Sequence, residues 1–232
     1  MSVQRDYILR LIEQFGQFWA AVVALSRAGQ HRDALALAER TRREAFGFDT
    51  ALLDRLSPDE LIGLLRLGHA PQLGQSWLTD RFTLLGLLLR AEAEVYRGLG
   101  DPARAADREE KSLALSLAAL ADDAAASPQA AETIEALVPG VKDRGIAPDL
   151  AYQLWHHDER AGRFSRAEDW LFAILDDDRA SPELHAEALA FYQRLAALDD
   201  ATLLRGDLPR NEVGAGLAEL QARIAAAQDA QG

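Results

Sequence analysis

The segment Leu99-Gly100-Asp101-Pro102-Ala103-Arg104-Ala105 decides the fold class, because it joins two long amphipathic stretches by a very short turn. Glycine ends a helix readily, since it adopts the left-handed conformation that a helix C-terminus often requires. Proline is favoured at the first position of the helix that follows. Ala105 is expected where the two helices cross most closely, and a larger side chain would push them apart. The segment therefore predicts an antiparallel helical hairpin.

The same spacing of glycine and alanine occurs twice more in the chain. Gly29 and Ala34 form the first copy, and Gly162 and Ala167 form the third. Each copy lies between two stretches with helical periodicity, so each predicts a further hairpin.

The middle copy resembles the tetratricopeptide repeat, in which small and aromatic residues recur at fixed offsets. The resemblance rests on Ala93, Tyr96, Gly100 and Ala105 in the middle copy, on Phe164, Ala167 and Leu171 in the third, and on Val22, Leu25, Gly29 and Ala34 in the first. The three glycines are separated by 71 and 62 residues and not by the ~34 residues of a tandem array, and the intervening helices do not fit the repeat. We therefore predict an all-α fold, a divergent tetratricopeptide-like array of antiparallel helical hairpins (α-α superhelix).

Composition supports helices throughout, since Ala and Leu dominate with Glu, Gln and Arg between them and no segment alternates like a strand. We expect helices at about 4–28, 31–46, 50–56, 58–67, 76–99, 102–120, 128–138, 148–161, 165–176, 182–198 and 211–228. Ser57 and Glu60 form a capping-box pattern at the start of one of them. The Ala/Asp-rich stretch 121–130 suggests an N-terminal unit, 1–121, and a C-terminal unit, 122–232, packed as one continuous array.

The formal net charge is −12 and the chain has no cysteine. The acidic field disfavours nucleic acid and acidic membrane surfaces as partners, because the arginines are interspersed with acidic residues and form no basic patch. The longest apolar runs, at 18–25 and 84–89, are far shorter than the ~20 residues of a membrane span. Since no signal peptide is apparent either, we expect a cytoplasmic protein of bacterial type.

Three segments resemble an uncharacterised bacterial family with tetratricopeptide-like helices. They are Gln4-Arg5-Asp6-Tyr7-Ile8-Leu9-Arg10-Leu11-Ile12-Glu13-Gln14, Leu56-Ser57-Pro58-Asp59-Glu60-Leu61 and Gly162-Arg163-Phe164-Ser165-Arg166-Ala167-Glu168-Asp169-Trp170-Leu171-Phe172. That family has no assigned activity, so the resemblance implies the fold and supplies no catalytic residue.

Catalytic and cofactor motifs are absent from the sequence, which has neither a Gly-x-Ser-x-Gly elbow nor a phosphate-binding loop after a strand. The most metal-like cluster is His156-His157-Asp158-Glu159, in which His156 and Glu159 share a helix face. No second group of ligands accompanies it, so we interpret the cluster as a polar helix face and predict no catalytic, cofactor or metal site.

In a tetratricopeptide register, the first helices of the three hairpins form an inner face that binds an extended peptide or a partner helix. The candidate partner-binding residues on this face are Trp19, Arg27, Arg90, Glu94, Arg97, Tyr152, His156 and Arg160. Arg90 and Arg97 either hold a carboxylate of a ligand or pair with Glu94 as ordinary surface ion pairs.

The leading functional hypothesis is a non-enzymatic protein-interaction or scaffold module that binds a protein or peptide. One alternative is an all-α enzyme or a ligand- or metal-binding protein with a site near His156. Another is a structural protein that forms homo-oligomers through the apolar face of its first helix.

Overall fold

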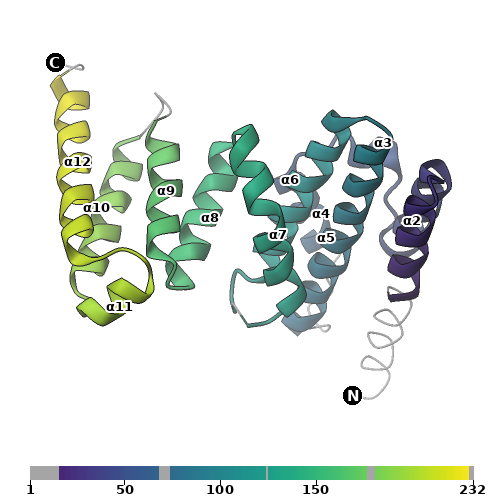
Figure 1. The fold of residues 1–232 in the computed structure, drawn as a ribbon, viewed down its shortest axis with the longest axis horizontal. Helices are drawn as coiled ribbons and strands as arrows, with labels where there is room; N and C mark the ends of the chain where they lie inside the picture. Colours follow the sequence, from purple (N-terminus) through teal and green to yellow (C-terminus); the bar gives the residue numbers. More distant parts are fainter. Residues whose placement is uncertain (1–15, 68–73, 124, 177–180, 230–232) are drawn as a thin grey trace. The chain divides into compact units, whose positions relative to one another are not determined.

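A computed structural model describes residues 16–67, 74–123, 125–176 and 181–229 of the chain, and the regular structure in these ranges is entirely helical (Figure 1). This confirms the all-α prediction. The chain forms two compact units, unit 1 (Met1–Gly145) and unit 2 (Ile146–Gly232). The described helices include none that is long and apolar enough to cross a bilayer.

Unit 1 is built around the hairpin of its two longest described helices, α5 and α6. After a helix over residues 16–27, its described part contains α2 (His31–Phe46), α3 (Thr50–Leu53), α4 (Pro58–Leu67), α5 (Gly74–Gly98), α6 (Pro102–Ala119) and α7 (Pro128–Arg144). Helix α2 packs against α5, whereas α4 and α7 pack against both α5 and α6. Leu85, Leu89, Leu113 and Leu115 are fully buried between them. The helix that follows the 121–130 stretch thus packs within unit 1, so the division between the units falls later than the composition of that stretch suggested.

Unit 2 contains a second close hairpin and an aromatic core. Its described helices are α8 (Pro148–Arg160), α9 (Phe164–Leu175), α10 (Pro182–Ala196), α11 (Asp200–Arg205) and α12 (Arg210–Asp229). Helix α8 pairs with α9, and α10 pairs with α12. The Trp155 and Phe191 rings meet edge to face at 5.7 Å, which joins α8 to α10.

The three glycine turns have one common geometry. Gly29, Gly100 and Gly162 have φ angles of 73°, 74° and 72°, in the left-handed region. In each turn the N–H of the residue after the glycine donates to the carbonyl oxygen five residues earlier, at 2.9, 3.0 and 2.9 Å. This is the Schellman arrangement, so the predicted helix ends are confirmed.

The alanines that follow these turns are buried, as their role at a helix crossing requires. Ala34 and Ala167 have no exposed surface, and Ala105 is 2% exposed. No room therefore remains at these positions for a longer side chain.

We expect Ala105→Leu to lower the free energy of unfolding of unit 1 by about 1–3 kcal/mol, because added methyl groups in a closed crossing force the helices apart. Urea unfolding followed by circular dichroism measures the effect. Ala103→Leu, at an exposed position of the same helix, is the matched control and should change stability by less than about 0.5 kcal/mol. Equal effects of the two substitutions would contradict a close crossing at Ala105.

The predicted capping box at the start of α4 is also confirmed. The backbone N–H of Ser57 donates to the Glu60 carboxylate at 2.8 Å, and the backbone N–H of Glu60 donates to the Ser57 hydroxyl at 3.2 Å. Asp199 caps α11 by accepting a hydrogen bond from the backbone N–H of Thr202 at 2.7 Å.

Two local predictions were wrong, at the end of α7 and at the segment that forms α11. Helix α7 continues through Pro139 to Arg144, since the buried residues Ile134, Val138 and Val141 extend one apolar face past the proline. The short helix α11 was not predicted. Gly216 lies inside α12 at a position where a Cβ would overlap the Tyr192 hydroxyl and the Glu168 carboxylate. The predicted start of the first helix, at about residue 4, and most of the predicted loop 68–75 lie outside the described residues.

Candidate functional site

A pocket of about 310 Å³ lies between the helix over residues 16–27 and α5, both in unit 1. Its lining residues are spaced so that each helix contributes one face: Trp19, Val22, Val23, Ser26 and Arg27 from the first, and Arg90, Ala91, Glu94 and Val95 from α5. Val22, Ala91 and Val95 are buried and form an apolar floor. Trp19 and Val23 are half-buried, so part of each apolar side chain remains accessible.

Two arginines give the pocket a local positive charge. Within the described ranges, neither Arg27 nor Arg90 makes a hydrogen bond or an ion pair. The carboxylate of Glu94, in contrast, pairs with Arg97 at 2.8 Å. Two guanidinium groups therefore line the pocket without an acidic partner among the described side chains, in a chain whose net charge is −12.

The structure brings together four of the five unit 1 residues that the sequence predicted for a partner surface. Trp19, Arg27, Arg90 and Glu94 line this one pocket. Arg97 does not line it and instead pairs with Glu94 and with the buried Glu109. Arg97 therefore forms ion pairs, as one interpretation expected, whereas Arg90 has no ion pair among the described residues.

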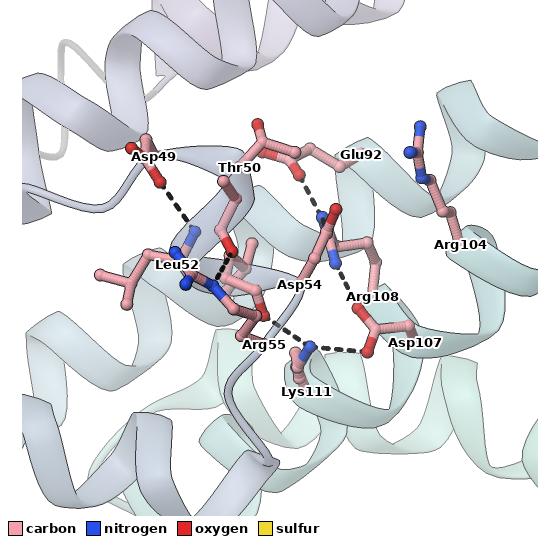
Figure 2. A network of polar contacts seen from close by, with 12 residues as sticks. Asp49, Thr50, Leu52, Asp54, Arg55, Glu92, Arg104, Asp107, Arg108 and Lys111 are labelled. Carbon is pink, nitrogen blue, oxygen red and sulfur yellow. Dashed lines mark hydrogen bonds and ion pairs between the residues drawn. The ribbon is translucent and has the colours of Figure 1, made fainter.

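Opposite the pocket, α5 is held by a buried ionic network, part of which Figure 2 shows. Glu92 is 2% exposed and accepts from Arg108 Nε at 3.1 Å. It also pairs with the fully buried Arg42 of α2. Arg42 donates in addition to the Phe48 carbonyl at 3.2 Å and to the Thr50 hydroxyl at 2.7 Å. The network therefore joins α2, α5 and α6 to the segment between α2 and α3.

Further contacts close the network around α6. Arg108 also pairs with Asp54 and Asp107. Lys111 Nζ donates to the Leu53 carbonyl at 2.8 Å and to Asp107 at 2.6 Å (Figure 2). The buried cations thus have anionic or carbonyl partners, as buried charges require.

The network sets the rotation of α5 about its own axis. Glu92 lies two residues from both Arg90 and Glu94, which places it about 200° around the helix from each. Anchoring Glu92 in the interior therefore directs Arg90 and Glu94 to the opposite side, where the pocket lies. Burial raises the pKa of Glu92, and the positive charges of Arg42 and Arg108 oppose this effect.

Sequence reasoning missed this network, because it treated the arginines and carboxylates as surface charges. A signal was present in the spacing of residues along α6. Arg108, Lys111 and Ser112 fall at helical spacing from Ala105, on the face predicted to be buried. Charged residues at core positions of an amphipathic helix indicate paired interior charges.

The remaining predicted residues, Tyr152, His156 and Arg160, belong to α8 in unit 2. The His156 ring stacks on Trp155, with centroids 4.6 Å apart, and meets Tyr152 edge to face at 4.5 Å. The Tyr152 hydroxyl donates to the Glu187 carboxylate at 2.9 Å, and Arg160 Nε donates to the His156 carbonyl at 3.2 Å. These contacts bring the three residues together as a polar and aromatic face beside α10.

The pKa of the His156 ring should lie below the ordinary value for histidine. Burial lowers its pKa, the carboxylates of Glu187 and Glu159 oppose this, and Arg194 and Arg160 reinforce it. An NMR titration of the ring protons should therefore give a pKa below the usual value of about 6.5. Because the folded state disfavours the charged ring, the stability that neutral His156 contributes is present above pH ~6.5 and is lost as the pH falls below it.

The control for this pH effect is His156→Phe, whose unfolding free energy should depend less on pH between neutral and mildly acidic conditions. A ring pKa at or above the ordinary value would show that the two carboxylates outweigh burial.

The side chains of the described residues form no group of three or more His, Asp or Glu that could hold a metal ion.

Comparison with curated proteins and with solved structures gives no match. A family model does match the chain, over residues 2–225. This range covers nearly all of both compact units and every residue of the pocket and the ionic network. The chain therefore belongs to DUF6483, a family of unknown function.

Proposed function

We propose that the protein is a non-enzymatic protein-interaction module whose pocket between residues 16–27 and α5 receives a segment of a partner protein. The observation that carries the proposal is that one pocket is lined both by the partly accessible Trp19 and Val23 and by Arg27 and Arg90. Tryptophan and arginine are the residues most enriched at the energetic centres of protein interfaces.

The finer fold assignment is part of this proposal. Three Schellman turns, each followed by a buried alanine, support a divergent tetratricopeptide-like array. We also propose a cytoplasmic location and a bacterial origin, as the sequence suggested. Arrays of this kind bind peptides or helices along the first helices of their hairpins. The helix over residues 16–27 and α5 are the first helices of two such hairpins, and the pocket lies between them.

Site-specific photocrosslinking tests the proposal. A photoreactive phenylalanine analogue replaces Val23 in the pocket, and a matched variant carries it at Arg43, an exposed residue of α2 outside the pocket. After illumination in the cells that encode the protein, we expect a defined heterologous adduct from position 23 but not from position 43. Co-expressed wild-type protein, which lacks the photoreactive analogue, should compete for the partner and lower the yield of this adduct.

Adducts of equal yield at both positions, or none at position 23, would contradict a docking role for the pocket. An adduct containing a second copy of this chain would assign the surface to self-association instead. Mass spectrometry of the crosslinked peptides distinguishes these outcomes.

A further inference from the structure

We infer that the partner segment which enters this pocket presents a carboxylate next to a large apolar side chain. The inference rests on the proposed function and specifies its ligand. Three properties of the pocket support it: two guanidinium groups without an acidic partner among the described residues, an apolar floor and a volume of about 310 Å³.

The charge of the pocket selects a carboxylate. Arg27 and Arg90 have no acidic partner within the described ranges, and a guanidinium group binds a carboxylate through two parallel hydrogen bonds. Arg90 is half-buried, so its interaction with an anion is less screened by solvent than that of a fully exposed side chain. The protein is acidic overall, so an acidic segment would be repelled elsewhere and favoured here.

The one acidic residue of the lining does not favour a cationic ligand. Glu94 is already paired with Arg97 at 2.8 Å, and its charge is compensated. A lysine or arginine of a partner would therefore meet two uncompensated positive charges and no free carboxylate among the described lining residues.

The apolar residues that line the pocket favour a large apolar side chain in the partner segment. Val22, Ala91 and Val95 close the pocket from below, and Trp19 and Val23 leave apolar surface accessible above them. Covering this surface removes it from water, which contributes about 25 cal/mol per Å². The volume of about 310 Å³ is at the lower end of ligand pockets, which span about 300–1,000 Å³. It suits one or two side chains of a segment rather than a folded surface.

Selection of displayed random peptides tests the ligand class. The wild-type protein serves as bait, and counter-selection uses Val23→Trp, which fills the pocket from a half-buried position. Circular dichroism and thermal unfolding must first show that this variant is folded. We expect the wild type to enrich peptides in which Asp or Glu flanks Leu, Ile, Phe or Trp, and Val23→Trp to lose them.

Fluorescence anisotropy with an enriched peptide then measures how much each arginine and the acidic residue of the peptide contribute to the binding affinity. Arg90→Gln and Arg27→Gln should each weaken binding about tenfold, since each removes a charge-assisted hydrogen bond. The same peptide with Gln in place of its acidic residue should bind the wild type about tenfold more weakly. Arg43→Gln, which alters an exposed arginine outside the pocket, should leave affinity unchanged. The exposed Arg27 provides a variant with little risk to folding.

The outcomes separate this inference from the proposed function. If the peptides depend on an open pocket but lack acidic residues, or if both arginine variants bind normally, the carboxylate inference is wrong and the docking pocket stands. If no peptide distinguishes the wild type from the folded Val23→Trp variant, the docking pocket itself is contradicted.

Discussion

Glu92→Gln is expected to lower the free energy of unfolding of unit 1 by about 3–5 kcal/mol, which is typical when one partner of a buried ion pair is removed. Glu92 is the anion between Arg42 and Arg108, and all three side chains are at most 2% exposed. Glutamine keeps the shape of the side chain but leaves Arg42 without a carboxylate among its described partners. Urea unfolding followed by circular dichroism measures the loss.

Two variants make this test specific. Glu39→Gln removes an exposed ion pair to Arg43 on the surface of α2 and should cost less than about 1 kcal/mol. Adding Arg42→Met to Glu92→Gln should recover part of the stability, because it removes the cation that was left unpaired in the interior. If Glu92→Gln costs no more than Glu39→Gln, the network does not hold the three helices together.

Asp158→Ala should destabilise unit 2 by about 3 kcal/mol, the second largest effect that we expect. Asp158 is fully buried and accepts hydrogen bonds from Arg163 Nε at 2.7 Å and from Trp170 Nε1 at 2.9 Å. Arg166 also donates to it, at 3.2 Å. The two arginines are about one-third exposed and can regain water, which keeps the expected loss below that of Glu92→Gln.

Hydrogen exchange measured by mass spectrometry can locate this effect. Faster exchange should be confined to peptides from α8 and α9, since Asp158 joins the end of α8 to the turn and to α9. Asp149→Ala, an exposed change in the first turn of α8, is the control and should cost at most about 1 kcal/mol. Unchanged exchange in the α8–α9 hairpin would show that Asp158 is dispensable.

The ionic network and the pocket occupy opposite faces of α5. Glu92 fixes the helix from the interior, and Arg90 and Glu94 then lie on the pocket side. Binding affinities measured for variants of the network should therefore be interpreted separately from those measured for variants of the pocket. Glu92→Gln is expected to affect both stability and the orientation of Arg90, whereas Arg27→Gln affects only the exposed pocket rim.

The sequence predicted the hairpins well, because their signals are local. Gly100, Asp101 and Ala105 each act within one turn: a left-handed helix end, an N-cap and a small side chain at the crossing. The α2 and α4 boundaries agree with the expected ranges for the same reason. The prediction was wrong where packing against other parts of the chain decides, as in the continuation of α7 through Pro139.

For the candidate site, the sequence supplied the residues and the structure supplied their partners. Trp19, Arg27, Arg90 and Glu94 were predicted to share one face from the hairpin register, and they line one pocket. The sequence could not tell Arg90 from Arg97, because both lie at helical spacing from Glu94. Only the tertiary structure shows that Glu109 on α6 gives Arg97 a second carboxylate, whereas Arg90 lines the pocket.

The sequence by itself thus determined an all-helical chain with three glycine turns and the small residues that let helices approach. These features depend on backbone conformation and side-chain size within a few residues. The tertiary structure alone decided which charges are buried and paired. Whether an arginine stabilises the interior, as Arg42 does, or remains accessible in a pocket, as Arg90 does, depends on side chains far away in the chain.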